Sequence, residues 1–305
     1  MQSLWMLVAS FGFSLMGVAV KLASETYSTA EIVMFRGLTG VVMLFLLLRW
    51  QGGSLRTRFG WQHLWRGMVG VASLWLWFYA IGKMPLATAM TLNYMSPVWM
   101  ALLIFIGALR RGQAGFPWGL LAAILCSALG VVLVLRPAFH ADQWHAGLMA
   151  LLSSLLAAFA YLAVLDLGRR GEPETRVVFY FSLSGAVAGL LSMQATPGVT
   201  LWHAHTLRGF GLLLAVGVLA TLAQIAMTRA YRLGNTLVTA NLQYTGIVFS
   251  SLWGILLWQD QLGLWSWLGM GLILLSGISA TYYNTRSAAA QNTPGVPPDP
   301  IASEP

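Results

Sequence analysis

Two similar polar segments, 150 residues apart, interrupt long apolar stretches of this sequence. The first, LATAMTLNYMSP, carries Asn93 beside Tyr94, and the second, LVTANLQYTG, carries Gln243 beside Tyr244. A carboxamide inside an apolar helix has no water to bond in a bilayer, so it should face another helix or a wet cavity. The repeated pattern predicts that the two pairs lie near each other and bind a small substrate. The alternative is that these amides only join helices.

Arg36 lies in an apolar stretch, where a charged side chain is costly. An arginine at the centre of a spanning helix costs about 2.5–3.5 kcal/mol on insertion scales. Its planar guanidinium matches a carboxylate or a phosphate, which makes Arg36 a candidate substrate-binding residue. The alternatives are that Arg36 pairs with Glu31 or reaches lipid headgroups. Gln224 adds another amide, with the same two interpretations as Gln243.

Aromatic residues and a proline could shape the same site. Trp75 and Tyr79 are four residues apart and share a helix face, so they are candidate cavity-lining residues, although packing is the simpler interpretation. Trp77 and Tyr161 belong to the same aromatic group. Pro97 frees a backbone carbonyl near the first amide and predicts a hinge, or a static kink, in that span.

The sequence does not offer a set of residues for catalysis at membrane depth. All nine acidic residues and all five histidines fall in expected loops, in the tail or near span ends. A membrane-embedded enzyme would need a nucleophile and base, a carboxylate pair or a metal set. We therefore expect no catalytic residue, no bound metal and no cofactor, and we expect a binding protein for a small molecule.

The composition indicates how these residues are positioned. Hydrophobic residues make up 58% of the 305 residues, charged residues make up 9%, and the mean hydropathy is +0.72. A soluble domain has about 25% charged residues, whereas a spanning helix needs roughly 20 apolar residues in a row. The sequence predicts an all-α polytopic membrane protein with ten transmembrane helices, at residues 3–23, 31–49, 64–82, 86–109, 116–135, 146–168, 176–194, 207–228, 236–258 and 264–284.

The basic residues set the expected orientation, because lysine and arginine near short loops stay in the cytoplasm. Four basic residues lie on one side of the expected spans and Arg36 lies within the second. The other twelve share the opposite side, and this pattern predicts cytoplasmic termini in an inner membrane and excludes a nucleic-acid surface: Arg49, Arg56, Arg58, Arg66, Arg110, Arg111, Arg169, Arg170, Arg176, Arg229, Arg232 and Arg286.

The two halves of the sequence can be overlaid. STAEIVMFRGLTG pairs with PETRVVFYFSLSG, and LATAMTLNY pairs with LVTANLQY after a single-residue gap. Because five spans are repeated and five is odd, the second copy must enter the membrane from the opposite side. We expect two inverted five-helix repeats, at residues 3–135 and 146–284, and a disordered cytoplasmic tail at 285–305.

These residues resemble the drug/metabolite transporter superfamily, in its EamA branch. The resemblance covers about residues 3–284 and rests on the FRGL element, the link GKMPLATA, the following NYMSPVW and the tandem five-span copies. It implies a ten-helix bundle with a midplane cavity between the repeats, and transport of amino acids, sugars, nucleotide-related compounds or toxic organics. The second copy departs from the first at Phe181, which replaces Arg36, and at Gly246 and Ile247, which flank the counterpart of Pro97.

The resulting prediction is a secondary transporter that exports small metabolites, such as amino acids or amphipathic compounds, across the inner membrane by alternating access. The alternatives are an importer or exchanger, and a membrane-embedded enzyme. The segment GMGLILLSG, residues 269–277, could also form a homodimer contact, since small residues allow close helix approach.

Overall fold

In the part that the structure describes, the chain consists of helices joined by loops and turns. This computed structural model describes residues 2–110, 112, 122, 125, 126, 129–134, 143–194, 202–234, 239 and 242–291. The helices of the first half are η1 (Gln2–Leu4), α1 (Trp5–Ala23), α2 (Thr29–Trp50), α3 (Gly60–Lys83), α4 (Leu86–Asn93) and α5 (Ser96–Arg110). Those of the second half are α7 (Trp144–Arg169), α8 (Glu174–Gln194), α9 (Leu207–Leu233), α11 (Thr245–Trp258) and α12 (Leu264–Gln291).

Seven helical segments in the described residues are long and apolar enough to cross a membrane, and α11 and the apolar part of α12 are shorter. The expected span at 116–135, the start of the span at 236–258 and residues 292–305 of the expected tail lie largely or wholly outside the described residues. The count of ten therefore stays a prediction. The helix α12 continues to Gln291, beyond the expected end at 284.

The expected span at 86–109 is broken into two helices. The helix α4 ends at Asn93, Tyr94 and Met95 form a turn, and α5 begins at Ser96. Pro97 has no N–H to donate to the carbonyl of Asn93, so the α-helical ladder cannot continue through this point. Tyr244 likewise forms a turn directly before α11 begins at Thr245, so a helix starts within each of the two polar segments.

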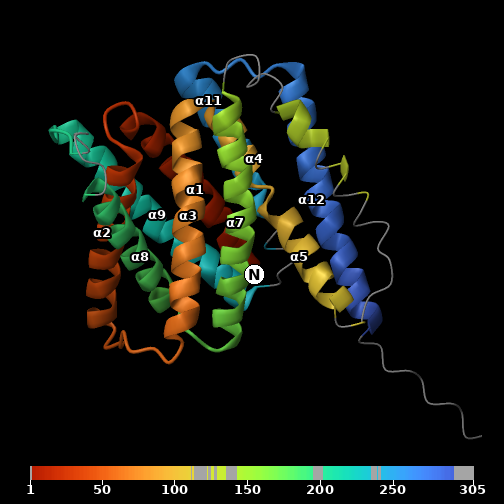
Figure 1. The fold of residues 1–305 in the computed structure, drawn as a ribbon, viewed down its shortest axis with the longest axis horizontal. Coiled ribbons are helices and arrows are strands. Elements are labelled where there is room, and N and C mark those ends of the chain that lie inside the picture. The colour runs from red at the N-terminus through yellow and green to blue at the C-terminus, as the bar shows by residue number, and fades with distance from the viewer. Residues whose placement is uncertain are drawn as a thin grey trace, which may run out of the picture.

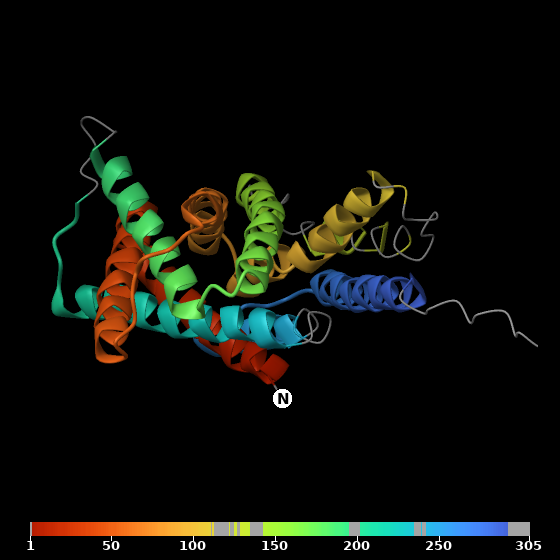
Figure 2. The ribbon, with the colours of Figure 1, turned by 90° about the horizontal axis from the view of Figure 1, so that it is seen from below.

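The helices pack in pairs that link the two halves. The largest contacts are those of α2 with α8, α1 with α9, and α3 with α7. Exchanging the halves converts the α1–α9 pair into the α7–α3 pair and leaves the α2–α8 pair unchanged, as a two-fold relation requires. Figures 1 and 2 show α5 and α12 side by side at one end of the molecule, where α5 also contacts α7.

The small residues expected at a dimer contact are partly used inside the chain. A Cβ atom on Gly269 of α12 would lie 2.7 Å from the carbonyl oxygen of Gly130 and 2.7 Å from a Val134 methyl carbon. The backbone of α12 therefore approaches the residue 129–134 segment closely. Gly271 has nothing within 4 Å of its Cβ position.

Glycines also bring α2 and α8 into backbone contact. A Cβ atom on Gly37 would overlap the backbone nitrogen of Ala186 and lie 2.6 Å from the carbonyl oxygen of Ser182. A Cβ atom on Gly189 would lie 2.7 Å from the backbone nitrogen of Met34. These neighbours are main-chain atoms, which cannot move aside as a flexible side chain can.

We expect Gly37→Ala to destabilise the protein by about 1–3 kcal/mol, because overpacking at this crossing forces two helices apart. Thermal unfolding of the purified protein in detergent measures the effect. The matched control is Gly211→Ala in α9, where nothing lies within 4 Å of the new methyl group. Equal unfolding temperatures for the two variants would contradict the prediction.

Candidate substrate cavity

A cavity lies between helices of both halves. Its empty volume, with the space at the open mouth included, is about 510 Å³. The helices α1, α2, α3, α4, α7, α8 and α9 contribute to its wall. The lining residues are Phe13, Arg36, Arg66, Gly70, Ser73, Leu74, Trp77, Asn93, Tyr94, Ala157, Ala160, Tyr161, Phe181 and Gln224.

Two buried arginines dominate the chemistry of the cavity. Arg36 and Arg66 are each only 3% exposed. The Cζ atom of Arg36 lies 4.9 Å from the centre of the Phe181 ring, and that of Arg66 lies 3.9 Å from it. In the described part of the chain, Nε of Arg36 and both Nε and Nη1 of Arg66 have no hydrogen-bond partner. The cavity thus holds two positive charges whose unbonded N–H groups can donate to a ligand.

Glu31 does not pair with Arg36. Its Oε1 accepts a hydrogen bond from the backbone nitrogen of His203 at 2.8 Å, and its Oε2 lies 2.6 Å from Nδ1 of the same histidine. The carboxylate also completes the capping box of α2 with Ser28. These contacts occupy both oxygens of Glu31 and leave Arg36 in the cavity.

The sequence analysis counted Arg66 among the basic residues near loops and did not single it out as a candidate cavity residue. The helix α3 begins at Gly60, so Arg66 lies well inside the helix and is buried. It shares one face with Gly70, Ser73 and Trp77, at the helical spacing of four, seven and eleven residues. A Cβ atom on Gly70 would overlap the guanidinium of Arg66 and lie 2.9 Å from the Phe181 ring, so this glycine makes room for the charge.

Of the amides in the two polar segments, one lines the cavity and the other does not. Asn93 lines it, and its Nδ2 donates a hydrogen bond to Oγ of Ser153 in α7 at 2.8 Å. Gln243 is buried beside it rather than in its wall: Oε1 accepts a bond from the Tyr231 hydroxyl at 2.9 Å, and Nε2 donates to Oγ of Ser96 at 3.4 Å. The hydrogen bond from Gln243 to Ser96 therefore joins the two segments, and the other two bonds attach each segment to a neighbouring helix.

The tyrosines of these segments are also buried. Tyr94 lines the cavity, and its hydroxyl lies against Gly246 at the start of α11. Tyr244 is 2% exposed and is not part of the cavity wall. The close approach of Tyr94 and Gly246 brings the two helix breaks together.

Of the remaining candidate residues, some line the cavity and others lie outside its wall. Gln224 is 5% exposed and lines the cavity. Trp75 packs against the hydrophobic core and Tyr79 is 40% exposed, and neither lines the cavity. Trp77, on the adjacent face of α3, does so instead. Pro97 lies one residue into α5, directly after the helix break.

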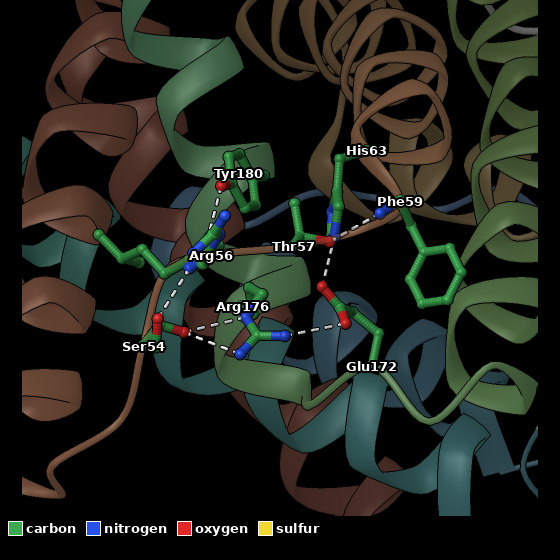
Figure 3. Close-up of polar contacts among 9 residues, drawn as sticks. Ser54, Arg56, Thr57, Phe59, His63, Glu172, Arg176 and Tyr180 are labelled. Atoms are coloured by element: carbon green, nitrogen blue, oxygen red, sulfur yellow. Dashed lines mark hydrogen bonds and ion pairs between the residues drawn. The ribbon is translucent and has the colours of Figure 1, made fainter.

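A polar cluster surrounds Glu172, in the connection between α7 and α8 (Figure 3). Nε2 of His63 lies 3.0 Å from Oε1 of Glu172, and Nη1 of Arg176 donates to Oε2 of the same carboxylate at 3.0 Å. Arg176 also donates two hydrogen bonds to the carbonyl of Ser54, and the Tyr180 hydroxyl donates to the carbonyl of Leu55. The cluster ties the segment before α3 to the start of α8.

Burial and bonding compete at this carboxylate. Burial raises the pKa of Glu172, but hydrogen bonds from Thr57 and His63 and the charge of Arg176 together outweigh it, so the pKa is lowered. A lowered pKa means that Glu172 stabilises the folded protein at neutral pH. This contribution is lost as the pH falls below the ordinary carboxyl value of 4.5.

We expect Glu172→Gln to lower stability by about 1.5–3 kcal/mol at neutral pH, because charged hydrogen bonds are lost at a buried position. The difference from the parent should shrink as the pH falls through the acidic range. Thermal unfolding at several pH values measures both effects. Asp166→Asn is the matched control, since its pair with Arg170 is exposed and worth about 0.3–0.5 kcal/mol. A difference that grows with acidity would contradict the assignment.

Three comparisons place this chain among known proteins. Residues 1–136 match the model of the EamA-like transporter family. The pseudopaline exporter CntI of Pseudomonas aeruginosa is 36% identical over 257 residues, which cover 83% of this chain and 86% of the relative. The riboflavin transporter of Vibrio cholerae is 27% identical over 299 residues, covering 94% of each chain.

A solved structure supports the fold. A crystal structure superimposes with a TM-score of 0.66 at 18% identity, covering 92% of this chain and 98% of the other. The sequence relatives are transporters by name, and the described helices are apolar and long enough to span a membrane. The chain is therefore a multi-pass membrane protein and a secondary transporter of small metabolites, and it belongs to the EamA-like transporter family.

Proposed function

We propose that this transporter exports a small polar or amphipathic metabolite, such as an amino acid, from the cytoplasm across the inner membrane. The buried polar cavity carries the proposal. Arg36, Arg66 and Asn93 come from the first half of the chain, and Tyr161 and Gln224 come from the second. Polar groups that converge at membrane depth between two halves are typical of a carrier binding site.

Alternating access would arise from rocking of two inverted five-helix repeats about this cavity. The helix pairing supports the repeats, because each large contact maps onto another, or onto itself, when the halves are exchanged. The breaks at Tyr94 and Tyr244 supply places where α4–α5 and the segment before α11 can bend. The Glu172 cluster and the Glu31–His203 contact are candidates for the contacts that close the two ends.

Orientation and direction rest on separate arguments. The end that carries the Glu172 cluster is also the arginine-rich side, and the positive-inside rule supports a cytoplasmic position for this end and for both termini. Similarity to the pseudopaline exporter favours export. Import is the second candidate, because the name of the riboflavin transporter, which matches over 94% of this chain, states no direction.

A comparison of metabolites tests export even though the substrate is not identified. Cells that express the parent chain, Asn93→Ala or Arg58→Gln are compared by untargeted mass spectrometry of medium and cell extract. The exposed Arg58 lies outside the cavity, so its variant serves as the control. We expect one or more metabolites to rise in the medium and fall in the cells with the parent and the control but not with Asn93→Ala.

Three outcomes would contradict the proposal. A metabolite that accumulates inside the cells would indicate import. A compound of new mass, formed at the expense of another, would indicate a membrane enzyme. Equal metabolite profiles for the parent and Asn93→Ala, at matched protein levels in the membrane, would remove this cavity as the binding site.

A further inference from the structure

We infer that the exported substrate carries two carboxylates, one for Arg36 and one for Arg66. The inference rests on the proposed function and adds the charge of the substrate to it. The two guanidinium groups lie over the same phenylalanine ring, at 4.9 Å and 3.9 Å from its centre. Both are almost completely buried.

No acidic side chain of the described residues compensates these charges. Each described carboxylate interacts with another basic group. The ion pairs are Glu31 with His203, Glu172 with His63 and Arg176, Glu174 with Arg232, and Asp166 with Arg170. Glu25 and Asp260 interact electrostatically with Lys21. The polar groups that line the cavity beside the arginines are amides and hydroxyls, which carry no charge. The wall thus has a net charge of two positive units.

The Phe181 ring does not replace a counter-charge. A cation–π contact contributes about 0.5–2 kcal/mol, whereas the effective cost of burying an ion is several kcal/mol. The ring also leaves Nε of Arg36 and both Nε and Nη1 of Arg66 without hydrogen bonds. A carboxylate would supply both a negative charge and acceptor oxygens to each guanidinium group.

The apolar part of the wall favours a carbon skeleton between the two charges. Phe13, Leu74 and Trp77 line the same cavity. A molecule with two carboxylates joined by a short hydrocarbon segment can bury that segment against these side chains and place a carboxylate on each arginine. Inorganic phosphate also carries negative charge, but it has no apolar surface to bury here.

A set of simple probes tests the inference. Glutarate has two carboxylates on a three-carbon linker, valerate has one carboxylate and a similar length, and inorganic phosphate has no carbon chain. Each is titrated, up to about 10 mM, against the purified full-length protein in detergent, and the unfolding temperature is recorded, since ligand binding raises it by mass action. Glutarate should give the largest increase with the parent.

The variants separate a two-charge site from a general effect of anions. In Arg66→Gln the apparent affinity for glutarate should fall at least about 10-fold, while the affinity for valerate changes by less than about 2-fold. Arg58→Gln, at an exposed position, should leave the glutarate titration unchanged. The amide in place of Arg66 keeps a polar side chain, and the unfolding temperature without ligand reports whether the variant is folded.

Several results would overturn the inference. These are a valerate or phosphate response equal to that of glutarate, no glutarate response, or an equal loss of glutarate and valerate affinity in Arg66→Gln. The export experiment separates this inference from the proposed function. A neutral or singly charged exported metabolite would end the two-carboxylate inference and leave the export function intact.

Discussion

Arg36→Met is expected to reduce transport strongly and, at the same time, to raise the unfolding temperature of the substrate-free protein. Methionine keeps much of the volume of arginine but removes a buried positive charge whose Nε has no partner among the described residues. Replacing buried charges with packed apolar side chains often stabilises a protein by about 1–4 kcal/mol. Losing a charged contact to the substrate costs about 2–5 kcal/mol, so transport should fall at least about 30-fold.

The opposite signs of the two effects distinguish binding from folding. Flux of the metabolite identified by mass spectrometry is measured in proteoliposomes, and unfolding is measured on the same preparation. Arg58→Met, at an exposed site, should change neither quantity much. A lower unfolding temperature for Arg36→Met would mean that the arginine serves the fold, and unchanged flux would mean that it does not contact the substrate.

Gly246→Ala is expected to destabilise the protein and to impair transport, because it separates the two helix breaks. A Cβ atom at this position would overlap the Tyr94 hydroxyl and lie 2.6 Å from Cζ of that ring. Tyr94 is 3% exposed, so its ring can move only against packed neighbours or into the cavity that it lines. Overpacking of this kind costs about 1–3 kcal/mol, and a displaced Tyr94 would also alter the cavity that it lines.

A double-mutant cycle that combines Gly246→Ala with Tyr94→Ala tests the contact directly. Tyr94→Ala alone should be destabilising, since it leaves a cavity. In the double variant the methyl group added at position 246 no longer meets the ring, so the combined effect should be smaller than the sum of the separate effects. Gly271→Ala is the control, because nothing lies within 4 Å of its Cβ position. Additive effects would contradict the contact.

The sequence alone predicted the apolar helices and the place where one of them breaks. Uninterrupted apolar stretches matched the described helices closely, because burial in a bilayer requires length and hydrophobicity rather than a particular partner. The break after Asn93 was predictable from Pro97, whose missing N–H acts locally. The burial of Asn93 and Gln243 followed from the cost of an unbonded amide in hydrocarbon.

The residues that face the cavity were harder to predict. Arg66 lies near the start of the expected span at 64–82 and was counted with the basic residues near loops, whereas α3 begins at Gly60 and places Arg66 more than one turn inside the helix. Trp75, Trp77 and Tyr79 have similar chemistry, so the face that meets the cavity depends on how α3 is rotated against α7 and α8. That rotation is set by contacts between segments far apart in the chain, which local sequence does not report.

The contact between Arg36 and Phe181 depends on a difference between the two halves of the chain. These two positions coincide when the halves of the sequence are overlaid, and the structure places one side chain over the other. A pair of identical subunits would bring the same residue to both sides of this contact. Two arginines would repel there and two phenylalanines would bind no anion, so the contact requires two halves that differ at this position, as the halves of a single chain can.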